Sequence, residues 1–230
     1  MTRDFSDVLR VMRLATGRRN ENDPDSSDTT MNQYILDFYT LGMPNDLKVY
    51  ELYTTFEFTV DTTPTDGVYN ALTLGLGDSI INITGRGFVS LTTQPTDSAS
   101  WNRLNIYQNP YDFYQKWGIR NEDVLTPGYP TDLLYYGNQI VVRPIPDQSY
   151  TIQIFAYTKN QDPDLEKDPD LPYDWWMRYV AYGAAQEYAR DYMIDEKRQG
   201  NIEREFMKQK KRMLTRTHNQ LKSSRCIPQF

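Results

Sequence analysis

The spacing of apolar residues predicts two helices near the start of the chain. In segments 4–16 and 29–42 the apolar positions recur every three or four residues, which is the period of a helix. The first helix should end at Gly17, because glycine tolerates the left-handed backbone of a C-cap. The second should take Asp28 as its N-cap and end at Gly42. Its buried face should consist of Met31, Ile35, Phe38 and Leu41.

Two further helices are predicted near the end of the chain, over 174–191 and 195–222. The last one has only a narrow apolar seam, formed by Ile202, Phe206, Met213 and Leu221 among charged residues. So thin a seam does not stabilise a long helix alone, and we expect a partner: the preceding helix, a neighbouring subunit or another protein. The residues expected to carry helix packing are Trp175, Trp176, Val180, Gly183, Ala184, Ala185, Ile202 and Phe206.

Between the helices the pattern changes to one typical of strands. Segment 47–60 alternates and is rich in β-branched and aromatic residues, and strand-like runs follow at 79–84 and 87–92. A short helix is expected over 111–117. Segment 133–157 has three strand-like runs separated by two turns, which predicts a β-meander whose last strand buries Tyr150, Ile152, Ile154 and Ala156.

These elements together predict an α+β fold. We expect segments 1–46 and 158–222 to form a helical bundle, because each terminal helix has an apolar face to cover. Segment 47–157 would be an inserted antiparallel β-sheet or sandwich, and 223–230 an extended C-terminal tail.

The residue counts argue against much of enzyme chemistry. The 230 residues include one cysteine, Cys226, and one histidine, His218, which exclude a disulfide framework and a metal site with two histidines in one chain. The chain has no dinucleotide, P-loop or nucleophile-elbow motif. Acidic pairs such as Asp66 and Asp78 are expected by chance among 31 acids. We therefore expect no catalytic residues, no metal and no cofactor, and hence no enzyme.

Charge is distributed unevenly along the chain. The segment from Glu196 to the end carries +7, so the preceding 195 residues carry −13, since the whole chain carries −6. A basic helix on an acidic body suits docking onto an acidic partner protein, and nucleic-acid binding through phosphates is the alternative. The 18 tyrosines and four tryptophans suit sheets or interfaces, and a carbohydrate-binding or hydrolytic β module is a further alternative.

No run of 18 apolar residues is present, and the first residues carry charge where a secretion signal needs apolar residues. We therefore expect no membrane span and no secretion through such a signal.

Segment 140–189 resembles the head-to-tail connector proteins of tailed bacteriophages, also called adaptor, head-completion or tail tubular A proteins. The resemblance rests on the strand pair around RPIPD, followed by Leu171-Pro172, Trp175 and a helix with Ala184 and Ala189. The early run TGRRN, followed by NDPDSSD, also looks like phage neck proteins. None of these motifs is catalytic.

The resemblance implies a structural virion protein that forms a ring, commonly twelvefold, beneath the portal. Such a ring joins the portal to a downstream tail or nozzle protein, and DNA passes through its lumen without specific binding. Another neck or tail ring of the same particle is the alternative. The resemblance and the basic tail together predict portal contacts for Lys208, Lys210, Lys211, Arg212, Arg216, Lys222, Arg225, Ile227 and Phe230.

Overall fold

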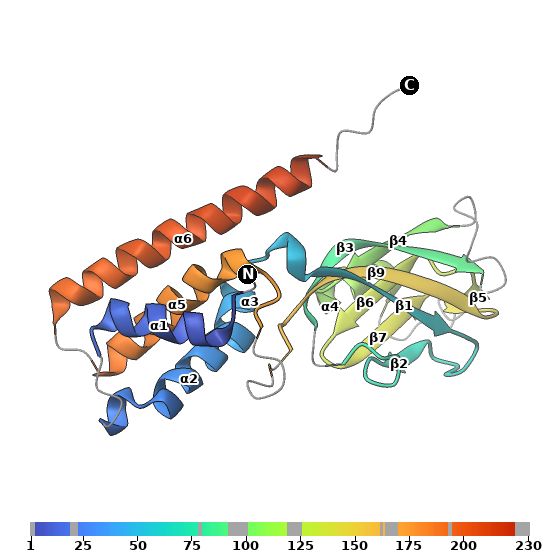
Figure 1. Cartoon of the computed structure of the whole chain (residues 1–230). Coiled ribbons are helices and arrows are strands. Elements are labelled where there is room, and N and C mark those ends of the chain that lie inside the picture. Colours follow the sequence, from blue (N-terminus) through green and yellow to red (C-terminus); the bar gives the residue numbers. More distant parts are fainter. Residues whose placement is uncertain are drawn as a thin grey trace. The chain divides into compact units, whose positions relative to one another are not determined.

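The structure is a computed structural model of the whole chain (Figure 1). It describes residues 3–18, 23–77, 80–91, 101–118, 126–161, 163, 170–192 and 195–223, with side chains in the last stretch only to 220. The chain divides into two compact units. The helical unit consists of Met1–Leu52 and Lys159–Phe230, and the sheet unit of Tyr53–Thr158. The α+β fold class predicted from the sequence is confirmed, with the sheet inserted between two helical segments.

The first boundary between the units lies six residues later than predicted. Residues 47–52 were expected to begin a strand, but strand β1 covers only Tyr53–Val60. Leu47, Val49 and Leu52 instead lie in the core of the helical unit, and Tyr50–Leu52 form a 3-10 turn, η3. An alternating pattern shows that one side of a segment is buried, but it does not show which core buries it.

The N-terminal helices begin and end at recognisable caps. In α1 (Phe5–Thr16), the Asp4 carboxylate accepts a hydrogen bond from the Asp7 N–H, and Gly17 adopts a left-handed φ of 70°. In α2 (Asp28–Asp37) the cap is Ser27, whose side chain accepts from the Thr30 N–H. The predicted cap, Asp28, is therefore the first residue of the helix.

The second helix does not end at Gly42 as predicted. It continues through a π turn, η2 (Phe38–Gly42), into α3 (Met43–Asp46), and the Met43 N–H donates to the Phe38 carbonyl. Because a π turn inserts an extra residue per turn, it rotates the residues that follow. Tyr39 is therefore buried, and Leu41, which was expected in the core, is 56% exposed.

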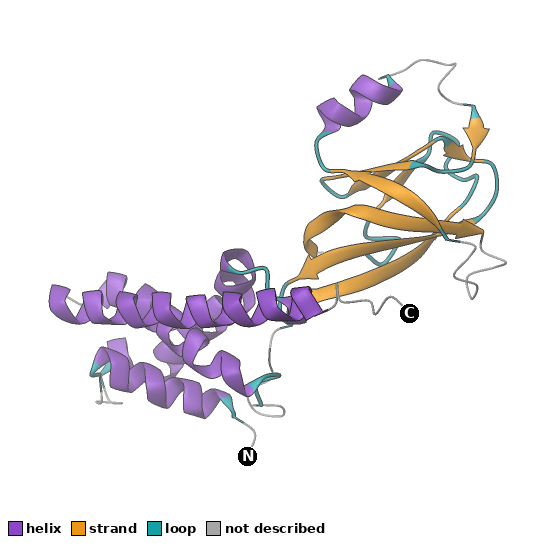
Figure 2. Cartoon of the chain, turned by 90° about the horizontal axis from the view of Figure 1, so that it is seen from above, coloured by secondary structure: helices purple, strands orange, loops and turns teal. Residues whose placement is uncertain are grey.

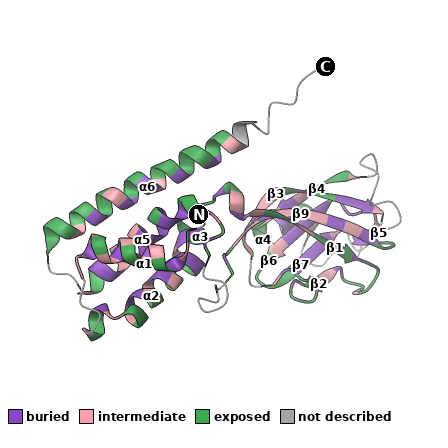
Figure 3. Ribbon diagram, viewed as in Figure 1, coloured by how far each residue is buried: buried purple, intermediate pink, exposed green. Residues whose placement is uncertain are grey.

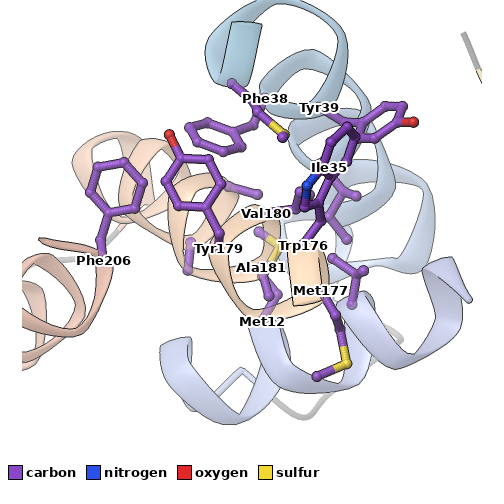
Figure 4. Close-up of a cluster of buried hydrophobic side chains, with 14 of the residues drawn as sticks. Met12, Ile35, Phe38, Tyr39, Trp176, Met177, Tyr179, Val180, Ala181 and Phe206 are labelled. Carbon is purple, nitrogen blue, oxygen red and sulfur yellow. The ribbon is translucent and has the colours of Figure 1, made fainter. Parts of the chain in front are cut away.

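The C-terminal helices complete the helical unit. A 3-10 turn, η6 (Asp174–Trp176), leads into α5 (Met177–Tyr192), and α6 covers Glu196–Ser223. Helix α5 is packed against α1, α2 and α6. Figure 4 shows Trp176, Tyr179 and Val180 from α5 and its preceding turn meeting Phe38 and Tyr39. Trp176, Val180 and Ala184, which are predicted to carry helix packing, are buried, and so is Tyr188 one turn further along α5.

Helix α6 packs on α5 of its own chain, which is one of the three partners that the sequence left open. Ile202, Phe206 and Met213 of the predicted seam are buried, together with Gln209 and Thr217. The side chain of Leu221 lies outside the described residues. Figure 3 shows most of the other described residues of α6 as exposed and a few as partly buried.

The sheet unit is built on seven strands in the order β1-β9-β3-β4-β6-β7-β2, with a separate pair, β5 and β8. Its strands are orange in Figure 2. The bounds are β2 (Val68–Asn70), β3 (Ile80–Leu91), β4 (Asn102–Tyr107), β5 (Pro127–Gly128), β6 (Asp132–Tyr136), β7 (Gln139–Arg143), β8 (Ile145–Pro146) and β9 (Tyr150–Thr158). The helix predicted at 111–117 is α4 (Pro110–Trp117), capped by Asn109.

The predicted β-meander is wrong in its last step. Strands β6 and β7 form the expected hairpin, but β9 pairs with β1 and β3. Its expected buried face is correct, because Tyr150, Ile152, Ile154 and Ala156 are all buried. Strand β9 has nine residues, and between the long strands β1 and β3 its backbone N–H and C=O groups find hydrogen-bond partners on both edges. The five-residue β7 is too short to pair with all of them.

Two further details of the sheet differ from the prediction. The described residues of the runs at 79–84 and 87–92 belong to one strand, β3, whose register with β9 shifts between Ile83 and Gly87. The sheet is also mixed and not purely antiparallel, because β4 and β6 run parallel. Helix α4 lies between these two strands in sequence, and a parallel pair requires such a crossover connection.

Candidate interaction surface

Among the residues that the structure describes, no three His, Cys, Asp or Glu side chains gather closely enough to hold a metal ion. In the same residues, no helix is long and apolar enough to span a membrane. The most deeply buried carboxylate, Asp132, is 0% exposed and contacts the Lys116 Nζ at 2.7 and 2.8 Å. It also accepts from the Thr131 hydroxyl at 2.7 Å, so this pair joins α4 to the sheet as a satisfied ion pair.

The helical unit has a hollow of about 460 Å³ with an unusual number of arginines. We call it the arginine groove. Its charged lining consists of Arg3, Arg178, Arg212 and Arg216, with Asp174 as the one acid among the described lining residues. Trp175, Met177, Tyr179, Gln209 and Met213 complete it. Four guanidinium groups around an aromatic and thioether floor suit a negatively charged partner that also has apolar surface.

The start of the chain forms one wall of the arginine groove because its backbone is fixed there. The Arg3 N–H donates to the Asp174 carboxylate at 2.8 Å, and the Leu171 N–H donates to the Arg3 carbonyl at 2.9 Å. The one acid in the groove is therefore already used to hold Arg3. A second carboxylate, Asp7, lies 3.4 Å from the Arg3 guanidinium.

The second half of α6 forms another wall through Arg216. This guanidinium lies 3.6 Å from the centre of the Trp175 ring, and its Nε lies 3.4 Å from a Glu51 carboxylate oxygen. The Glu51 side chain is only 5% exposed, and both of its oxygens lack a hydrogen bond among the described residues. The Arg216 guanidinium therefore neutralises the buried charge of Glu51 and contacts the Trp175 ring, so it is largely engaged within its own chain.

Arg178 and Arg212 are different, because their charge is available. Both are exposed, and neither forms an ion pair with any residue that the structure describes. The Arg212 guanidinium donates only to the neutral side chain of Gln209, at 3.3 Å. These two residues, one on α5 and one on α6, give the arginine groove its unneutralised positive charge.

On the other side of the apolar seam of α6, polar side chains hold this helix against its neighbours. The Tyr179 hydroxyl donates to the Asp46 carboxylate at 2.5 Å, and Lys210 forms an ion pair with the same carboxylate. Burial, followed by this hydrogen bond and the charge of Asp46, raises the pKa of Tyr179 above its ordinary value. Lys210 thus links α6 to α3 within the chain.

The cations predicted for portal contacts fall into different environments. Lys208 is exposed but lies 3.2 Å from Glu205 on its own helix, and Lys211 is exposed. Lys210 and Arg216 are engaged internally as above, so only part of the predicted set is free. The side chain of Lys222 and all of Arg225, Ile227 and Phe230 lie outside the described residues.

The residues predicted for helix packing are all buried except Trp175. Trp176, Val180, Gly183, Ala184, Ala185, Ile202 and Phe206 belong to one core cluster or its immediate backbone. Trp175 is 39% exposed, because it precedes α5 and turns toward Arg216 while Trp176 turns inward. Two adjacent residues of one turn cannot face the same side.

The sequence reasoning missed Arg3, Arg178 and the arginine groove itself. One signal was present: Arg178 is the only charged residue between Trp175 and Gln186. A charge in so apolar a helix marks the position at which the helix surface reaches solvent. Nothing in the sequence indicated that Arg3 would lie beside it, because that depends on a contact 171 residues away.

Two apolar side chains lie on the exposed side of α6, apart from its buried seam. Met207 and Leu214 are 55% and 46% exposed, and Lys211 lies between them in sequence. Residues seven apart share a helix face, so the pair forms a short stripe beside free positive charge.

The chain was also compared with models of known protein families and with curated proteins, and none of them matches.

Proposed function

We propose that this chain is a non-enzymatic structural protein of a virion, a subunit of the neck ring that joins the portal to the tail and surrounds the passing DNA. The observation that carries the proposal is α6, a 28-residue helix with nine cations and three acids that buries only a narrow seam on its own chain. A surface this large, exposed, basic and partly apolar is typical of an assembly protein that docks onto acidic partners.

The domain organisation supports the same proposal. Both ends of the chain build one helical unit, and a separate sheet unit is inserted between them. A ring protein needs two kinds of contact, one to its neighbours and one to the next component, and two compact units supply two independent surfaces. The resemblance of segment 140–189 to phage connectors spans the end of the sheet unit and the beginning of the second segment of the helical unit.

The acidic body suits a DNA conduit. Residues 1–195 carry −13, and like charges on a lumen wall would not hold the passing genome. Neutralising acids that face the lumen should then slow DNA ejection, and an unchanged rate would contradict this part of the proposal.

The test is the mass of the purified chain, by native mass spectrometry or sedimentation, alone and with the portal protein of the same particle. We expect a closed ring, alone or on the portal, and a chain that stays monomeric and ignores the portal would overturn the proposal. A variant lacking residues 223–230 should keep the fold by circular dichroism and lose portal attachment. Normal attachment of this variant would restrict the portal contact to the exposed face of α6.

A carbohydrate-binding module is the second candidate, because one specific feature favours it. Tyr53, Phe88 and Phe155 lie next to one another on neighbouring strands, and the rings of Tyr53 and Phe155 are stacked at 5.9 Å. These rings are only partly covered within the sheet unit, and sugars bind against such surfaces. A glycan array separates the candidates, since a neck protein should bind no glycan.

A further inference from the structure

We propose that the arginine groove of one copy binds an acidic cluster of a second copy, so that copies of the chain associate head to tail. The acidic cluster consists of Asp37 at the end of α2 and of Glu187 and Asp191 on α5. This inference rests on the proposed ring and specifies the contact between its subunits. It is carried by three features of the helical unit: the unneutralised groove, the unneutralised cluster, and their positions on opposite sides of α5.

The groove needs a negative partner that the described chain does not supply. Of its four guanidinium groups, that of Arg3 is paired with Asp7 and that of Arg216 with Glu51, and the one acid of the lining, Asp174, accepts a hydrogen bond from the Arg3 N–H. Arg178 and Arg212 are exposed and form no ion pair with any residue that the structure describes. The floor of Trp175, Tyr179 and Met213 would exclude water from an ion pair formed there, which strengthens it.

The acidic cluster is the corresponding feature of opposite sign. Asp37 and Asp191 are exposed, and Glu187 is half-buried. Asp191 also accepts a hydrogen bond from the Tyr34 hydroxyl of α2 at 2.5 Å, so α2 and α5 meet at this cluster. Burial raises the pKa of the Glu187 carboxyl, Arg190 opposes this, and the charges of Asp37 and Asp191 raise the pKa further. Three carboxylates therefore share one region with Arg190, while Lys159 lines a hollow beside Asp37, and a further cation from outside would relieve the remaining repulsion.

The two patches cannot neutralise each other within one molecule. Arg178 and Glu187 are nine residues apart on α5, which corresponds to about 180° of rotation and about 13.5 Å along the axis. They therefore face opposite sides of the helix. Two different complementary patches on opposite sides of one unit produce a head-to-tail contact, and repetition of this contact closes into a ring when the rotation permits.

A second copy is a better occupant of the groove than a nucleic acid. A phosphate backbone would approach a chain whose first 195 residues carry −13, so most of the surface would repel it. A second copy instead provides carboxylates in a fixed cluster. It also presents Leu41, which is 56% exposed on the π turn that follows Asp37, to the apolar floor.

The experiment uses two charge-reversed variants of the full chain. The groove variant is R178E/R212E, and the cluster variant is D37K/D191K. All four substituted positions are exposed, so each variant should keep the helical circular-dichroism signal of the wild-type chain. The matched control is K197E/R204E, which reverses two exposed cations of α6 outside the groove lining and outside the residues predicted to contact the portal.

Sedimentation and native mass spectrometry are run on each protein at low salt, alone and with portal. We expect the wild-type chain and the control to associate and each variant to remain monomeric. A mixture of the two variants should associate again, because each reversed patch then meets a patch of opposite sign. Association of the groove variant by itself would overturn the proposal.

Three further outcomes would also overturn it. Loss of association that the mixture does not restore would assign the groove to another acidic partner. A salt-dependent shift of double-stranded DNA by the wild-type chain, absent from the groove variant, would assign it to phosphate. A wild-type chain that binds portal while its copies stay separate would overturn this inference and leave the neck function intact.

Discussion

At the scale of single residues, the helical unit depends on side-chain size at one contact. Gly183 of α5 faces the ring of Phe38, and a Cβ built on Gly183 would lie 2.1 Å from the Phe38 Cζ. The helix therefore needs a residue without a side chain at this point. The sequence showed the run of small residues Gly183, Ala184 and Ala185, but the large partner at Phe38 is visible only in the fold.

Gly183→Ala should therefore destabilise the chain by about 1–3 kcal/mol, because the packed Phe38 ring must move. The matched control is Gly200→Ala in α6, where nothing lies within 4 Å of the added Cβ. That change should stabilise the helix by up to about 1 kcal/mol, since alanine has the higher helix propensity. Urea unfolding of both variants tests the pair, and equal effects of the two substitutions would contradict the contact.

A second residue-scale prediction concerns alkaline pH. Burial raises the pKa of Tyr39 from 10 to about 12. Between these values the unfolded chain loses the phenolic proton while the folded chain keeps it, so stability falls as pH rises. Tyr39 should contribute a slope of about 1.4 kcal/mol per pH unit in this window. Tyr39→Phe should flatten the dependence of unfolding free energy on pH above 10, and an unchanged slope would show that the hydroxyl is solvated.

At the scale of elements, most helix and strand segments were predictable because their apolar period is regular. Helices α1, α4, α5 and α6, the β6–β7 hairpin and the buried face of β9 all follow from spacing alone. The errors occur where the same local pattern of apolar residues is compatible with two different structures. The π turn at 38–42 keeps a helical appearance in sequence but shifts the buried face, and the strand-like run at 47–52 belongs to a helical core.

One element-scale prediction concerns how α6 is held by Arg216. Arg216→Ala should cost about 1–3 kcal/mol, because Glu51 would stay buried without its counter-charge and Trp175 would lose its cation. The double variant R216A/E51Q should recover part of this loss, since a neutral amide is cheaper to bury. Lys211→Ala on the exposed face is the control and should change stability by less than about 0.5 kcal/mol. Denaturant unfolding measures all three, and equal losses for R216A and K211A would exclude a role for the buried pair.

At the scale of the whole molecule, the insertion is possible because the sheet unit begins and ends on neighbouring strands. Tyr53 at the start of β1 is directly paired with Tyr157 near the end of β9. The chain therefore leaves and returns to the helical unit at adjacent points. Each unit also has a separate buried cluster, and the sheet unit adds a second, smaller one under α4.

The sheet unit should consequently fold without the helices. A fragment of residues 53–158 should show a cooperative thermal transition and dispersed amide resonances, because its main core contains 16 buried residues of its own. The reciprocal variant, in which a short glycine–serine linker replaces 53–158, should retain helical circular dichroism. An unfolded fragment would show that the two units depend on each other for stability.

The sequence by itself determined which segments are helical or extended, which face of most of them is buried, and that two helical segments flank a sheet. These properties are local, since they follow from the period of apolar residues and from caps and turns. Only the tertiary structure decided the order of the strands, the central position of β9 and the arginine groove. These depend on contacts between residues far apart in the chain, such as Arg3 with Asp174 and Glu51 with Arg216, and no local pattern encodes such pairings.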